Sequence, residues 1–94
     1  MSRETEILDM IRNACIEAGA QKVILFGSRA KGTHHERSDF DIAVAGVTDM
    51  ILLQQMIEEL PTLYEIDVVD LDTCKNHLLM EEIKEYGCKI FEAL

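Results

Sequence analysis

Residues Gly27 to Val44 read GSRAKGTHHERSDFDIAV, and this stretch decides the fold of the chain. It joins a Gly-Ser pair to the acidic residues Asp39 and Asp41 across ten intervening residues. The apolar run from Val23 to Phe26 stands directly before the glycine and predicts a strand that is covered on both faces. The polar, glycine-containing segment from Ser28 to Ser38 predicts a short helical turn followed by a loop, and the segment from Asp39 to Ala45 predicts a second strand.

Apolar periodicity on both sides of this stretch predicts three longer helices and two further strands. The helices are expected over residues 7–18, 50–60 and 76–86, ended by Gly19, Pro61 and Gly87, and the strands over residues 64–71 and 88–91, the last at a sheet edge. This order predicts a single domain, residues 1–94, of the α/β (α+β) class. We expect a small mixed β-sheet flanked by helices that pack on one face.

Composition excludes several classes of protein. A chain of 94 residues with 48% hydrophobic residues fits one compact domain and leaves no room for a second. The formal charge of -9 argues against broad contact with nucleic acid phosphates, so we expect no direct nucleic acid binding. The longest uncharged apolar stretch, Ile42 to Val47, is too short to span a membrane. The three cysteines, Cys15, Cys74 and Cys88, suggest no disulfide framework, and we expect a cytoplasmic protein without membrane contact.

Asp39 and Asp41 lie two residues apart on an expected strand. Their side chains should therefore leave the same face of the sheet about 6.5 to 7 Å apart. Phe40 and Ile42 then face the core. The plain alternative is a pair of solvated acids at the entrance to a strand.

A third acid, Asp67, should join this face if the strand over residues 64–71 lies alongside, because parity places it there and turns Ile66 and Val68 to the core. Asp70 is a competing acid of opposite parity, expected at the strand end or capping the next turn. Carboxylates this close repel one another and raise each other's pKa values, so cations are needed nearby. Oxygen ligands suit Mg²⁺ or Mn²⁺, and two ions ~3.5 to 4 Å apart can clamp a reacting phosphoryl group.

The Gly-Ser end predicts the complementary half of a nucleotide site. Gly27 would let a phosphate approach the backbone, and the amide and hydroxyl of Ser28 would face the triphosphate, unless Ser28 is an ordinary helix cap. Arg29, Lys31 and Arg37 fall in the one locally basic segment and could offset phosphate charge, although solvated loop cations have the same pattern. The adjacent histidines, His34 and His35, have the pattern of exposed polar residues, and their roles stay unassigned.

This combination of motifs resembles the DNA polymerase β-like nucleotidyltransferase superfamily, and the short chain looks like its minimal nucleotidyltransferase branch. The resemblance covers nearly the whole chain. It implies that Asp39 and Asp41 are shared metal ligands and that Asp67 is the ligand nearest the attacking hydroxyl. It also implies that Gly27 and Ser28 form the phosphate turn. The one mild departure, at position 31, is a lysine where an arginine is common.

The resemblance further implies a protein adenylyltransferase that binds ATP with two Mg²⁺ ions. Members of this branch are typically encoded beside a helical HEPN-type RNase toxin and act as its antitoxin by transferring AMP to a tyrosine hydroxyl. We therefore expect a hetero-oligomer with such a toxin, whose basic surface could meet the acidic stretch from Asp49 to Asp72.

Two alternatives stay open from the sequence. The protein could be a catalytically silent antitoxin that neutralises its partner by surface contact alone. A small-molecule modifier is less favoured, because such enzymes need a further acceptor-binding domain. Neither the base preference of the nucleotide nor the acceptor is fixed by the residues.

Overall fold

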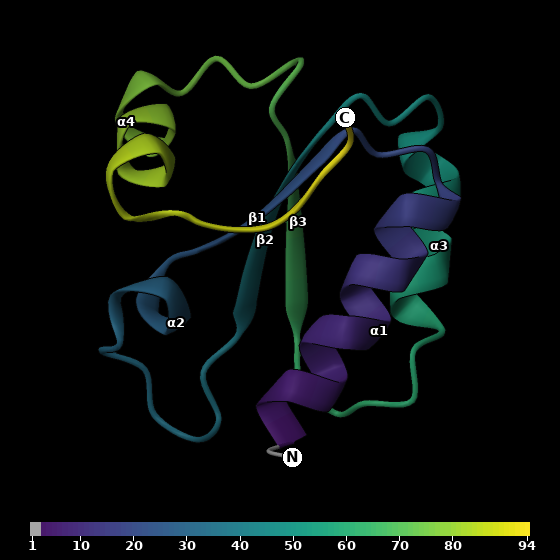
Figure 1. Cartoon of the computed structure of the whole chain (residues 1–94). Coiled ribbons are helices and arrows are strands. Elements are labelled where there is room, and N and C mark those ends of the chain that lie inside the picture. Colours follow the sequence, from purple (N-terminus) through teal and green to yellow (C-terminus); the bar gives the residue numbers. More distant parts are fainter. Residues whose placement is uncertain (1–2) are drawn as a thin grey trace.

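The computed structural model describes residues 3–94 and contains four helices and four strands in that range. They follow the predicted order along the chain: α1 (Arg3–Glu17), β1 (Lys22–Phe26), α2 (Ser28–Lys31), β2 (Phe40–Ala45), α3 (Met50–Glu58), β3 (Ile66–Asp70), α4 (His77–Tyr86) and β4 (Cys88–Glu92). Figure 1 shows the sheet standing between two groups of helices. No helix within residues 3–94 is long and apolar enough to cross a membrane.

The four strands form one mixed sheet in the order β3-β2-β1-β4. β1 pairs antiparallel with both β2 and β4, while β2 and β3 run parallel. A parallel pair needs a long crossover, which α3 supplies; its N-cap Asp49 accepts a hydrogen bond from the backbone N–H of Leu52 at 3.0 Å. The mixed sheet and the edge position of the last strand are confirmed.

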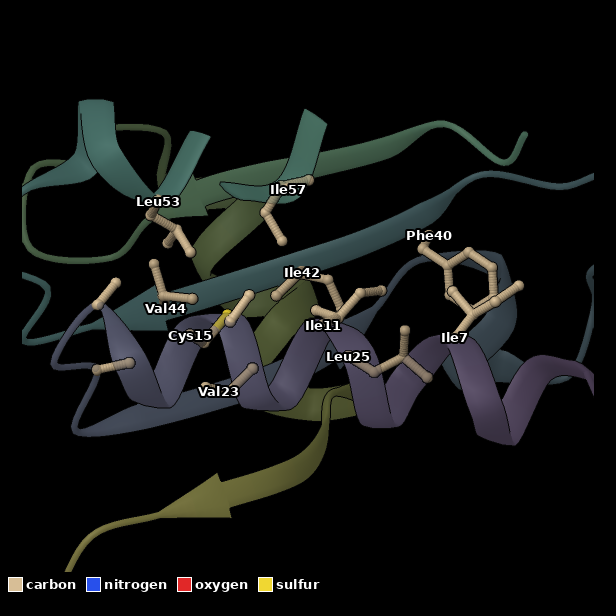
Figure 2. Packing of buried hydrophobic residues seen from close by; sticks show 13 residues of the cluster. Ile7, Ile11, Cys15, Val23, Leu25, Phe40, Ile42, Val44, Leu53 and Ile57 are labelled. Atoms are coloured by element: carbon tan, nitrogen blue, oxygen red, sulfur yellow. The ribbon is translucent and has the colours of Figure 1, made fainter. Parts of the chain in front are cut away.

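The prediction that the helices pack on one face is wrong. α1 and α3 cover one face, where β1 and β2 contribute alternate residues to the main apolar cluster, shown in Figure 2. α4 covers the opposite face, where Ile83 packs against Phe26 and Ala43. The reason is that β1 and β2 are apolar on both faces, so each face needs a covering helix.

Candidate active site

Asp41 and Asp67 stand directly opposite each other on the parallel strands β2 and β3. Asp39 lies immediately before β2, two residues from Asp41, and parity places it on the same face. The intervening Phe40 is fully buried in the main apolar cluster on the other face. The structure therefore brings the three predicted carboxylates to one face at the entrance to two neighbouring strands.

Residues 66 and 68 of β3 pack against the main cluster, as parity predicts. Asp70 is the last residue of β3, and its carboxylate accepts a hydrogen bond from the backbone N–H of Asp72 at 3.0 Å. The expectation that Asp70 lies at the strand end and holds the next turn is confirmed. Asp70 therefore does not compete with Asp67 for a place beside Asp41.

Gly27 brings the Gly-Ser turn against the acids. Its backbone has φ 73° and ψ -156°, a conformation that is essentially restricted to glycine. A Cβ at this position would lie only 2.3 Å from Oδ2 of Asp41. The group that approaches Gly27 closely is thus the carboxylate of Asp41. The sequence did not predict this contact, because a phosphate was expected beside Gly27.

The carboxylate of Asp41 has an unfavourable environment for its charge. Its pKa is raised above the ordinary value, first by burial and then by the negative charges of Asp67, Asp39 and Glu82. None of the ion pairs within residues 3–94 involves any of the three predicted acids. Within the described residues, no cation therefore forms an ion pair with this cluster.

Glu82 is a neighbour of the site that the sequence analysis missed. It lies on α4, one residue before the buried Ile83, and its carboxylate pairs with Lys31 of α2. A helical position three residues after Leu79 shares the face that turns towards the sheet, and that spacing was the available signal. The ion pair connects α2 to α4.

The donor chemistry at the site fits a hard divalent cation, because the three side chains offer only carboxylate oxygens and repel one another. As the side chains stand, however, no group of three or more metal-ligating residues within residues 3–94 is gathered closely enough to hold an ion. Asp39 and Asp67 are exposed and Asp41 is half-buried, so the first two can turn towards a ligand.

The predicted nucleotide-binding residues have different surroundings. Ser28 is the first residue of α2, and Gly27 is the cap, without a side-chain cap bond, so the reading of Ser28 as a helix cap is wrong. The ammonium group of Lys31 forms an ion pair with Glu82, and its Nζ lies 5.1 Å from the centre of the Tyr86 ring. Arg37 is exposed and, with Asp39, lines an open cavity of about 540 Å³.

Arg29 is buried, with only 4% of its side chain exposed. Its hydrogen bonds go to carbonyl groups of the loop that precedes β2. Binding of a nucleotide phosphate by Arg29 stays a prediction. The observed contacts instead connect its side chain to the loop before β2.

The adjacent histidines differ from each other. His35 is exposed, as expected. His34 is half-buried; its Nε2 lies 3.7 Å from a carboxylate oxygen of Glu4, while its Nδ1 is buried without a hydrogen-bond partner. Neither imidazole is part of a group of metal-ligating residues in the described chain.

Comparison with known proteins connects this geometry to one family. Residues 10–93 match the family described as "Polymerase beta, Nucleotidyltransferase". No curated protein matches the chain.

Solved structures of toxin-antitoxin complexes are similar to the chain over nearly its whole length. One, crystallised with AMP-PNP, has a TM-score of 0.72 and 27% identity and covers 98% of this chain and 75% of its own. A mutant of the pair MntA-HpeT has a TM-score of 0.71 and 26% identity with the same coverage. A second mutant of that pair reaches 28% identity at a TM-score of 0.64, covering 99% of this chain and 75% of its own.

Proposed function

The chain belongs to the polymerase beta nucleotidyltransferase family, and we propose that it transfers AMP from ATP to a tyrosine hydroxyl of a HEPN-type toxin, which it thereby neutralises. The observation that carries this proposal is the placement of Asp41 between Asp67 on the next strand and Gly27 on the turn. The likeness to toxin-antitoxin complexes, one of them with AMP-PNP, supports both the partner and the nucleotide.

Each task of the proposed reaction falls to a specific residue of this chain. The backbone of Gly27 and the amide and hydroxyl of Ser28 would hold the triphosphate at the start of α2. Two Mg²⁺ ions, or Mn²⁺ in their place, would be bound by Asp39, Asp41 and Asp67 and would neutralise the phosphate charge and activate the acceptor. Asp41 is half-buried beside the turn, whereas Asp39 and Asp67 are exposed.

The reaction is an in-line displacement at the α-phosphorus. The acceptor oxygen forms a bond to the α-phosphorus, the bond from that phosphorus to the bridging oxygen of the β-phosphate breaks, and pyrophosphate leaves. Asp67 is exposed on the edge strand β3, where an incoming hydroxyl can reach it, and it accepts the proton of that hydroxyl. Positioning and charge stabilisation supply most of the rate enhancement.

The test uses the protein with the product of the neighbouring gene as the candidate toxin. ATP labelled at the α-phosphate is mixed with the wild type, the Asp41→Asn variant and the Asp70→Asn control, and label on the toxin is counted. We expect Asp41→Asn to reduce transfer by about 100- to 1,000-fold, the range for removing one group that stabilises transition-state charge. Asp70→Asn, which changes an acid that only holds a turn, should transfer normally. Full transfer by Asp41→Asn would refute the proposed site.

A silent antitoxin is the second candidate. Ile51 on α3 and Leu63 in the loop that follows are 75% and 105% exposed, within a segment that contains acids and no base, which favours a protein-binding surface. In the same experiment, toxin inhibition without label would support this candidate. Inhibition that requires ATP and leaves label on the toxin would support the enzyme.

A further inference from the structure

Arg29 is the one buried charged or polar residue among residues 3–94. It belongs to α2, the helical turn that begins at Ser28. Burial of a guanidinium is expensive unless its N–H groups find acceptors, so the partners of this side chain reveal its role.

The guanidinium binds the loop immediately before the first acid of the site. Its Nε and Nη2 both donate to the carbonyl oxygen of Ser38, at 3.1 and 2.8 Å, and Nη2 also donates to the carbonyl oxygen of Glu36 at 3.2 Å. Nη1 lies 3.6 Å from the carboxylate of Glu4 on α1. Each nitrogen of the guanidinium therefore has a partner within the chain.

The same group also packs on the residue that follows Asp39. Its Cζ lies 4.0 Å from the centre of the Phe40 ring and 5.2 Å from that of Tyr64, and the two rings meet edge to face at 5.4 Å. The Arg29 side chain thus contacts both chain neighbours of Asp39: the carbonyl of Ser38 before it and the ring of Phe40 after it.

We propose that Arg29 is a positioning residue, which holds the backbone of Asp39 at a fixed place relative to the Gly-Ser turn and does not itself bind the nucleotide. The consequence for transfer rests on the proposed function, whereas the consequence for the loop does not. A lysine cannot replace Arg29, because a single ammonium group lacks the planar fork that bonds two carbonyls while it stacks on a ring.

A second arginine of the chain offers a matched control. Nε of Arg12 donates to the carbonyl oxygen of Ile90 at 3.2 Å, and its Cζ lies 5.4 Å from the centre of the Phe91 ring. The contact types are those of Arg29, but they join α1 to the far edge strand β4. Arg12→Met therefore removes contacts of the same kinds, a carbonyl hydrogen bond and a ring contact, although fewer of them, without touching the loop before β2.

The primary experiment is hydrogen exchange on the full chain without nucleotide. The reporting amides are those of Ser38 and Phe40, which donate to the carbonyl oxygens of His35 and Glu65 at 3.1 and 2.9 Å. We expect Arg29→Lys and Arg29→Met to speed exchange of these amides about tenfold relative to the amides of β1, and Arg12→Met to leave that ratio unchanged. If Arg29→Met does not fold, Arg29→Lys, which retains the charge and most of the volume, gives the answer. An unchanged ratio in the folded Arg29 variant would overturn the proposal.

Transfer kinetics separate positioning from nucleotide binding. If Arg29 positions Asp39, Arg29→Lys should lower kcat about tenfold or more and change KM for ATP less than twofold. A raised KM with unchanged kcat would identify Arg29 as a nucleotide ligand and would also overturn the proposal. If the wild type transfers no AMP, the proposed function fails, while the exchange rates still decide the role of Arg29.

Discussion

The two faces of the sheet differ in how much apolar surface they bury. On the face covered by α1 and α3, a cluster of 13 buried residues forms the core in Figure 2. On the face covered by α4, the corresponding cluster has three buried residues, Phe26, Ala43 and Ile83. Asp41 shares this second face, since it alternates with Phe40 and Ile42 along β2. A sheet that draws most of its stability from one side can carry mutually repelling acids on the other.

The largest effect is expected from the same substitution made on each face. Ile42→Ala removes a fully buried side chain from the main cluster and should lower the free energy of unfolding by about 2 to 5 kcal/mol. Ile24→Ala, on the half-buried α4 face, should lower it by only about 1 to 2 kcal/mol. Urea denaturation monitored by circular dichroism measures both. Equal losses would mean that the two faces contribute alike.

A second prediction compares two glycines with positive φ. Gly27→Ala adds a Cβ against the Asp41 carboxylate in a conformation that only glycine adopts readily, and should lower the free energy of unfolding by about 2 to 4 kcal/mol. Gly32→Ala has the same sign of φ, but its Cβ meets nothing within 4 Å, so it should lose about 1 to 2 kcal/mol.

The control for this pair is spectroscopic. Both variants should retain the helix and strand content of the wild type, as far-UV circular dichroism reports. A Gly27→Ala protein as stable as Gly32→Ala would contradict the close approach of the turn to the carboxylate of Asp41.

A smaller effect of opposite sign is expected from Asp41→Asn in the presence of EDTA. Because the folded-state pKa of Asp41 is raised, the native state binds this proton more tightly than the unfolded chain does. The stabilisation that comes from protonated Asp41 is fully present below its ordinary pKa of 3.8. It is lost as the pH rises through the raised folded-state pKa. At neutral pH the variant, which carries no charge there, should therefore melt at a higher temperature than the wild type.

The pH dependence provides the check. The stability gained by Asp41→Asn should shrink as the pH falls through the raised folded-state pKa of Asp41 and should be smallest below 3.8, and Asp70→Asn should show no such gain. Thermal melts of the three proteins between pH 3 and pH 7 measure this difference. A wild type that is more stable than Asp41→Asn at neutral pH without metal would contradict the repulsion among the acids.

The smallest effect concerns thiol chemistry and leaves stability unchanged. Burial raises the pKa of Cys15 in the main cluster to about 11, whereas Cys88 is exposed on the edge strand β4. Since the thiolate is the reactive form, an aromatic disulfide reagent at pH 8 should modify Cys88 rapidly and Cys15 only when the protein opens. Equal rates for the two thiols would show that the main cluster opens readily.

Much of this arrangement could be predicted from local patterns. Alternation along β2 and β3 placed Asp39, Asp41 and Asp67 on one face, because side chains on neighbouring parallel strands keep a common parity. Parity does not reveal which face receives the last helix, and α4 accordingly lies opposite to the predicted side.

The basic loop shows the limit of the sequence more clearly. Arg29, Lys31 and Arg37 form one charged pattern, yet the first is buried, the second pairs with Glu82 and the third is exposed. The pairing of residues 31 and 82 joins positions 51 apart in the chain, and the burial of Arg29 depends on one aromatic ring from β2 and one from the loop before β3. Such contacts form only when distant parts of the chain come together in the fold, so no local periodicity predicts them.

The sheet ends in β3 on one side and β4 on the other. An open strand edge is a template on which another copy of a protein can polymerise, and charged side chains at the edge oppose that growth. β3 carries Asp67 and Asp70 along such an edge, and β4 carries Lys89 and Glu92. Asp67, to which we assign proton transfer, thus also opposes aggregation through the β3 edge.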